Sequence, residues 1–311
     1  MQSELFSSEV SFSTHDTAES LRALDELFHL AGQFSTRAAY GDLLRFIARF
    51  RAYSPYNAML IHTQMPGARY VATPRRWLQE YSRKIVPGAK ALTILQPKGP
   101  VLFVFDVSDT SPMAGAPKLP QSITNPFAII RGLEKGELDK TIENAMRDGV
   151  RVHEREFGSQ QAGRIQISDT SDVFRLSEGS LFKQQTVTVP VQYELLLNSR
   201  QRREERYATL VHELGHLYCG HLGSPNEQHW LSRTGLSEQI VECEAESISY
   251  LVCARLGIET PSAQYLARHL NDEGKMPQIS LDAVIKVAGL IQQMGRSRLP
   301  LRKDAKDGAS A

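Results

Sequence analysis

The segment from Tyr207 to His221 reads YATLVHELGHLYCGH and contains an HExxH motif formed by His212, Glu213 and His216. Residues four apart on an α-helix lie on one face, so both imidazoles can hold one metal ion while Glu213 stands beside it. Apolar residues recur at helical spacing around the motif: Leu210, Val211, Leu214, Leu217 and Tyr218. Both histidines lie on or beside this apolar stripe, which favours a buried metal-binding helix over a surface helix with two incidental histidines.

A second long helix with several acidic residues is predicted between residues 238 and 253. Glu242 and Glu246 are four apart and share a face, whereas Glu244 points roughly the opposite way. We therefore expect Glu242 to be the third ligand of a zinc ion, and Glu246 to hydrogen-bond a ligating histidine and fix its tautomer. The alternative is a solvated acidic helix face that binds no metal.

The order HELGH, followed after about 25 residues by E-x-x-A-E, resembles the gluzincin metallopeptidases. Within them it is most similar to the ImmA/IrrE group and to the C-terminal domain of ArdC-type antirestriction proteins. The resemblance implies that His212, His216 and Glu242 bind Zn²⁺ and that Glu213 is the general base. One departure is Glu246, which stands where these families more often have Asn or Asp.

Composition limits the class of protein further. A chain of 311 residues with 41% hydrophobic content can form two globular domains. The absence of an apolar run of 18 residues argues against a membrane span, and the N-terminus lacks the layout of a secretory signal. The three cysteines, Cys219, Cys243 and Cys253, are expected to pack as small hydrophobic residues, with metal ligation by Cys219 or Cys243 as the alternative. A cytoplasmic location is expected.

Positive charge is concentrated in the N-terminal third of the chain. Between Thr36 and Pro100, eleven Lys and Arg residues face two acidic residues, a net charge of +9 in a chain whose total is +1. Aromatic residues alternate with these cations: Phe46, Phe50, Tyr53, Tyr56, Tyr70, Trp77 and Tyr81. This composition is typical of single-strand nucleic-acid binding, although a basic surface over an aromatic core has it too. The expected nucleic-acid contacts are Arg69, Arg75, Arg76, Trp77, Arg83, Lys84 and Lys90.

The same region resembles the N-terminal domain of ArdC-type proteins over residues 40–110. The resemblance rests on Ser54–Ile61, Pro66–Ala68 and Thr73–Trp77, on a turn at Pro87-Gly88, and on strands expected at residues 92–95 and 101–110, the second ending in F-D-V-S-x-T. Pro87 stands where the family usually has Lys or Arg, so one expected cation is missing. The resemblance implies a module that binds nucleic acid.

We expect an α+β protein. Residues 21–110 would form a small α/β nucleic-acid-binding-like domain, and residues 127–302 a mainly helical zincin-like metallopeptidase domain with a small sheet. Residues 111–126 read as a linker, residues 1–20 as disordered and residues 303–311 as a frayed tail. In the second domain we expect a helix at residues 142–157 and an edge strand at residues 186–191, near enough to the metal to bind an extended peptide by strand addition.

These features predict a zinc-dependent metalloendopeptidase. Zinc would polarise the scissile carbonyl and acidify a bound water, whose proton Glu213 would accept. The expected partners are a protein or peptide substrate, such as a repressor or a DNA-bound protein, and single-stranded DNA, with no membrane. The alternative is a DNA-binding antirestriction-type protein of mobile elements whose zinc site is auxiliary or structural. Tyr218, His221 and His229 are candidates for stabilising the oxyanion, and each is also compatible with a purely structural role.

Overall fold

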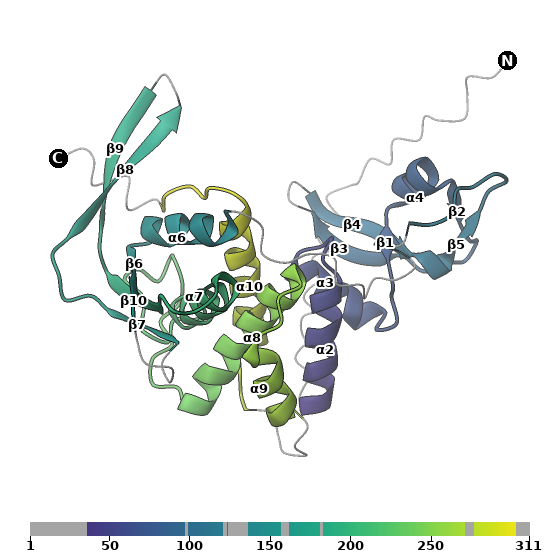
Figure 1. Ribbon diagram of the computed structural model, residues 1–311. Coiled ribbons are helices and arrows are strands. Elements are labelled where there is room, and N and C mark those ends of the chain that lie inside the picture. Colours follow the sequence, from purple (N-terminus) through teal and green to yellow (C-terminus); the bar gives the residue numbers. More distant parts are fainter. Residues whose placement is uncertain are drawn as a thin grey trace. The chain divides into compact units, whose positions relative to one another are not determined.

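The computed structural model describes residues 36–96, 99–120, 123, 136–156, 162–180, 183–270 and 277–302. The protein is a mixed α+β chain, as expected. It divides into two compact units, one within Asn57–Pro126 and the other comprising Ser35–Tyr56 together with the part after Phe127 (Figure 1). The ends expected to be disordered, residues 1–20 and 303–311, lie outside the described residues. Among the described helices, none is both long and apolar enough to span a membrane.

The first unit is built from short elements arranged in two small antiparallel sheets. In chain order these are α3 (Pro55–Gln64, whose first two residues belong to the other unit), β1 (Val71–Ala72), α4 (Pro74–Tyr81), β2 (Arg83–Ile85), β3 (Leu92–Gln96), β4 (Gly99–Asp106), the 3-10 helix η1 (Val107–Asp109) and β5 (Thr110–Pro112). One sheet has the order β1-β4-β3 and the other pairs β2 with β5. The strand expected at residues 92–95 is confirmed, and the one expected at 101–110 ends at Asp106.

The aspartate of the F-D-V-S segment, Asp106, is buried and accepts hydrogen bonds from two parts of the chain. Its side chain accepts hydrogen bonds from the amides of Arg69 and Tyr70, at 2.7 and 3.0 Å, and from the amide and hydroxyl of Ser108, at 3.0 and 2.8 Å. One carboxylate therefore ties the end of β4 to the chain entering β1. Such local side-chain bonds stabilise turns by satisfying backbone donors that no ladder pairs.

Several aromatic residues of the first unit, including Trp77 and Tyr81, lie in its core. Trp77 is fully buried and donates through Nε1 to the carbonyl of Phe105 at 2.9 Å. Leu119 and Ile123, from the segment expected to be a linker, pack against the same cluster. The described part of residues 111–126 is thus folded onto the first unit, because its apolar side chains complete that core.

The second unit contains most of the helices. Its elements are α2 (Arg37–Arg49), α6 (Glu137–Arg147), β6 (Val150–Arg155), β7 (Gly163–Ile167), β8 (Val173–Ser180), β9 (Lys183–Pro190), β10 (Tyr193–Asn198), α7 (Arg203–Tyr218), α8 (Glu238–Leu256), α9 (Pro261–Leu270) and α10 (Leu281–Arg296). A mixed sheet has the order β6-β10-β7, with β6 parallel and β7 antiparallel to β10. Strands β8 and β9 form a separate hairpin.

Helix α2 belongs to the second unit, whereas the expected domain boundaries placed it in the first. Its apolar face is buried against α8, and the Tyr40 hydroxyl lies 2.8 Å from the Ser247 hydroxyl on that helix. Buried Arg255 donates to the carbonyls of Ile47 and Phe50, at 2.6 and 3.0 Å, and so satisfies the end of α2. Four of the eleven N-terminal cations therefore lie in the unit that holds the HExxH motif: Arg37, Arg45, Arg49 and Arg51.

The helix expected at residues 142–157 is wrong in its second half. Helix α6 ends at Arg147, and residues 150–155 form β6 instead. Gly149 separates the two with a φ of +79°, a conformation that side chains rarely adopt, and a Cβ there would lie 2.6 Å from the carbonyl oxygen of Pro190. Gly149 therefore ends the helix before the residues that were expected to continue it.

The strand expected at residues 186–191 is present as β9, but it pairs with β8 in a hairpin. The edge strand that packs on the HExxH helix α7 is β7. Its approach requires glycine, because a Cβ at Gly163 would lie 2.5 Å from a methyl of Thr209 on α7. The strand beside the motif is therefore β7, which our sequence analysis did not predict.

Candidate metal centre

Helices α7 and α8 bring the three expected ligands together. His212 and His216 lie on α7 with their Nε2 atoms 3.1 Å apart, and Glu242 lies on α8. The Glu242 carboxylate is 3.6 Å from Nε2 of His212 and 3.4 Å from Nε2 of His216. One donor atom from each residue falls within 4.8 Å of the others. Two imidazole nitrogens and one carboxylate oxygen form a donor set that suits zinc and leaves a coordination position open.

The close approach of the two helices depends on small residues next to the ligands. A Cβ added at Gly215 would lie 3.4 Å from Cα of Ala245 and 3.5 Å from a side-chain carbon of Ile248. Gly215 precedes His216, and Ala245 precedes Glu246. A side chain larger than a methyl group at Gly215 would push α8, and with it Glu242, away from the histidines.

Burial keeps the His216 ring neutral. Removal from solvent lowers the pKa of His216 to about 3, with further lowering by His212 and His221 and an opposing effect of Glu244. A neutral imidazole has a free nitrogen lone pair, which is the form that binds a metal ion.

Glu213 lies at the same centre and is not part of the ligand cluster. Burial raises the pKa of the Glu213 carboxyl and Glu242 adds to this, while His212 and a hydrogen bond from the Ile165 amide of β7 lower it. A carboxylate with a raised pKa is a better proton acceptor near neutral pH than an ordinary glutamate.

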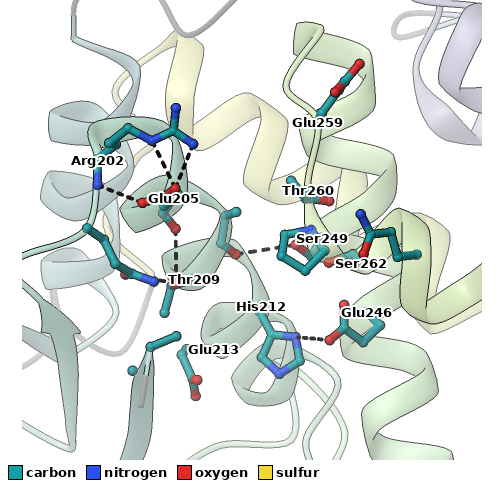
Figure 2. A pocket seen from close by; sticks show the side chains of 16 residues that line it. Arg202, Glu205, Thr209, His212, Glu213, Glu246, Ser249, Glu259, Thr260 and Ser262 are labelled. Carbon is teal, nitrogen blue, oxygen red and sulfur yellow. Dashed lines mark hydrogen bonds and ion pairs between the residues drawn. The ribbon is translucent and has the colours of Figure 1, made fainter. Parts of the chain in front are cut away.

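Glu246 lies close to His212, although not at the hydrogen-bonding distance expected from the sequence. Its Oε1 lies 3.7 Å from Nδ1 of His212, the nitrogen opposite the ligand cluster (Figure 2). Its Oε2 is buried and has no hydrogen-bond partner among the described residues. The glutamate side chain thus comes within ion-pair distance of His212.

A cavity of about 710 Å³ opens beside these residues. His212, Glu213 and Glu246 lie on one side, and hydroxyl groups line other parts of it, from Thr209, Ser249, Thr260 and Ser262 (Figure 2). Gly163 at the start of β7 also borders it. The cavity has room for a side chain of an extended peptide next to the candidate base.

The residues considered for oxyanion stabilisation are engaged elsewhere. The Tyr218 hydroxyl donates to Asp148 at 2.9 Å, and His229 packs beside Trp230 with ring centroids 6.0 Å apart. The His221 ring lies 3.0 Å from His216 and 2.9 Å from Glu244. Among the described residues, none of the three candidates borders the cavity.

Glu244, His221 and Arg233 form a buried polar cluster that our sequence analysis missed. Glu244 is fully buried on the face of α8 expected to point away from the site, and Arg233 donates to it from both terminal guanidinium nitrogens at 2.7 Å. Burial alone would raise the pKa of Glu244, but hydrogen bonds from His221, Arg233 and the Ser280 amide outweigh it and lower the pKa to about 2. The sequence feature that could have indicated this cluster is His221 itself, a histidine five residues after His216.

The residues expected to contact nucleic acid fall into two groups. Arg69, Arg75, Arg76, Lys84 and Lys90 are exposed on the first unit. Trp77 is buried in the core and cannot offer a ring face to a base, so the structure does not support its expected contact. Arg83 is half-buried and donates to Thr110 at 2.7 Å.

The cysteines match the expectation of small hydrophobic packing. All three are buried and free of disulfides, and burial raises the pKa of each thiol. A second group of potential donors comprises Cys219, His221 and Glu244. Both Glu244 oxygens are already bound by the Arg233 cation, which disfavours a metal ion at that position.

The ligand assignment predicts metal content directly. Wild-type protein should carry about one equivalent of zinc, and His216→Ala or Glu242→Ala should carry less than about half an equivalent, because each removes one of three protein ligands. Glu238→Ala is the matched control, since Glu238 is exposed one turn earlier on α8. Metal analysis of the purified proteins tests this, and equal zinc in Glu242→Ala and wild type would contradict the assignment.

Comparisons with known proteins give one family match and one structural match. A search of curated protein sequences finds no match. The crystal structure of the antirestriction ArdC protein from the R388 plasmid, in a metal-free form, is similar at a TM-score of 0.34 and 16% identity, covering 86% of this chain and 97% of that chain. The family model of the IrrE N-terminal-like domain, peptidase M78, matches residues 145–251. The resemblance to the ImmA/IrrE group is thereby confirmed for the segment that carries the HExxH helix and Glu242.

Proposed function

We propose that the protein is a zinc-dependent metalloendopeptidase. The observation that carries this proposal is the placement of Glu213 beside the cluster of His212, His216 and Glu242, at the edge of a cavity. The match of residues 145–251 to a peptidase family supports the same activity. A zinc ion held there would act as a Lewis acid toward a peptide carbonyl and lower the pKa of water.

The side chains around the cluster have separate roles in proton transfer and in orienting the ligands. Glu213 accepts a proton from the attacking water at its carboxylate and delivers it to the leaving amine, a role suited to its raised pKa. The Glu246 carboxylate lies 3.7 Å from Nδ1 of His212, where its negative charge favours a proton on Nδ1 and so a free Nε2 facing the cluster. Strand β7 supports the base, because the Ile165 amide donates to the Glu213 carboxylate.

Replacement of the base separates catalysis from metal binding. Glu213→Gln keeps the size of the side chain and should retain zinc, while peptide hydrolysis falls by about 10²–10⁴-fold through loss of general-base catalysis. A mixture of unstructured peptides, analysed by mass spectrometry after incubation with zinc-loaded protein, provides the readout without a known substrate.

Glu204→Gln is the control, because Glu204 is exposed in the first turn of the same helix. It should leave both zinc content and hydrolysis unchanged. Wild-type hydrolysis by Glu213→Gln would refute the peptidase proposal.

A second candidate function is binding of single-stranded DNA by the first unit, with the metal centre auxiliary or structural. The observation that favours it is the exposure of five of the seven expected contact residues there: Arg69, Arg75, Arg76, Lys84 and Lys90. Exposed cations of this kind bind a phosphate backbone with an affinity that depends on salt. The buried aromatic residues of this unit weaken the idea of base stacking, so phosphate contacts would dominate.

Charge removal tests this second function. The triple change Arg75→Ala, Lys84→Ala and Lys90→Ala should weaken binding of an oligonucleotide and reduce the slope of log affinity against log salt by about 2, given a contribution of about 0.7 per phosphate contact on a single strand. Arg45→Ala, Arg200→Ala and Lys286→Ala remove the same charge from exposed positions of the other unit. Equal affinity and slope in the two triple variants would exclude specific binding through the first unit.

A further inference from the structure

We propose that His221, held by Glu244 and Arg233, is a positioning residue that orients the ring of His216 and fixes its tautomer for metal binding. This inference rests on the proposed metal centre and adds a part of it outside the expected ligand set. His212 and His216 would then be supported by different means, the first directly by Glu246 and the second through a relay of three side chains.

The relay is continuous in the structure. Nδ1 of His216 lies 3.0 Å from Nδ1 of His221, and Nε2 of His221 lies 2.9 Å from Oε2 of Glu244. Arg233 binds both oxygens of Glu244 at 2.7 Å, and the Ser280 amide donates to Oε1 at 2.6 Å. The His221 side chain is only 4% exposed and that of Glu244 is 0% exposed. In this buried setting each hydrogen bond is protected from competition by water.

One arrangement of protons satisfies every member of the relay. Nε2 of His216 faces His212 and Glu242, so a metal at that point requires the ring proton on Nδ1. That Nδ1–H then donates to Nδ1 of His221, which leaves the His221 proton on Nε2, where it donates to Glu244. The reverse assignment would place a proton on Nε2 of His216 and block its lone pair. The carboxylate of Glu244 therefore selects the tautomer of a ring that it does not touch.

The segment after α7 is folded so that it completes this relay. Gly220 has a φ of +76°, and a Cβ there would collide with the carbonyl oxygen of Leu231. The Arg233 amide donates to the Gly220 carbonyl at 2.9 Å, and its guanidinium donates to the Cys219 carbonyl at 3.3 Å. These contacts fix the backbone of Arg233 against the end of α7, which places its guanidinium next to Glu244.

The test is metal binding by the full-length protein. Competition with a chromophoric chelator gives the zinc affinity, and the visible spectrum of the cobalt-substituted protein reports ligand geometry. His221→Leu should weaken zinc binding by about 10–100-fold, as loss of outer hydrogen-bond partners does, and should alter the cobalt spectrum. His221→Asn keeps an acceptor near the position of Nδ1 and should recover part of the affinity, which a loss of packing alone would not predict.

His229→Leu is the matched control, because it removes a histidine of the same segment that packs beside Trp230. It should bind zinc as the wild type does. Wild-type affinity and spectrum in both His221 variants would overturn the relay while leaving the metal centre intact. If the wild type bound two equivalents of zinc and His221→Leu bound only one, the relay would be overturned too, since His221 would then be a ligand of the second ion. Failure of the wild type to bind either metal would overturn the centre itself and the relay with it.

Discussion

The packing of α7 against α8 at Gly215 and Ala245 is the contact on which the candidate site depends. Two ligands and the base come from the first helix and the third ligand from the second, so their separation sets the size of the metal position. A Cβ at Gly215 would already touch the backbone of Ala245, at 3.4 Å. Well-packed helices tolerate little extra volume, so a side chain larger than a methyl group at Gly215 would separate the helices and widen the metal position.

The polar residues around the cluster differ in charge and in the partners that balance that charge. His216 is neutral because it is buried, and the acidic groups around it differ in their partners. Hydrogen bonds from His221, Arg233 and the Ser280 amide lower the pKa of Glu244, whereas Glu246 and Glu213 border the cavity. A cation in the cluster would compensate the carboxylates that have no Arg partner, including the buried Glu246 oxygen that lacks a hydrogen bond among the described residues.

Sequence spacing predicted the relations in this site between residues of the same helix. The i and i+4 relations of His212 with His216, and of Glu242 with Glu246, place these residues as expected. The relay through His221 could not be predicted in this way, because Arg233 reaches Glu244 only through the fold of the segment that follows α7. The membership of α2 in the second unit was missed for a similar reason, since its partner α8 lies about 200 residues away in the chain. Burial of Trp77 likewise follows from long-range packing rather than from its basic neighbours.

X-ray absorption at the zinc edge of the loaded protein tests the central claim most directly, because it identifies the atoms bound to the ion. The account predicts a first shell of nitrogen and oxygen at about 2.0–2.2 Å, with the scattering pattern of two imidazoles. A sulfur contribution at about 2.3 Å would instead place the ion at Cys219 or Cys243 and contradict the ligand set of His212, His216 and Glu242.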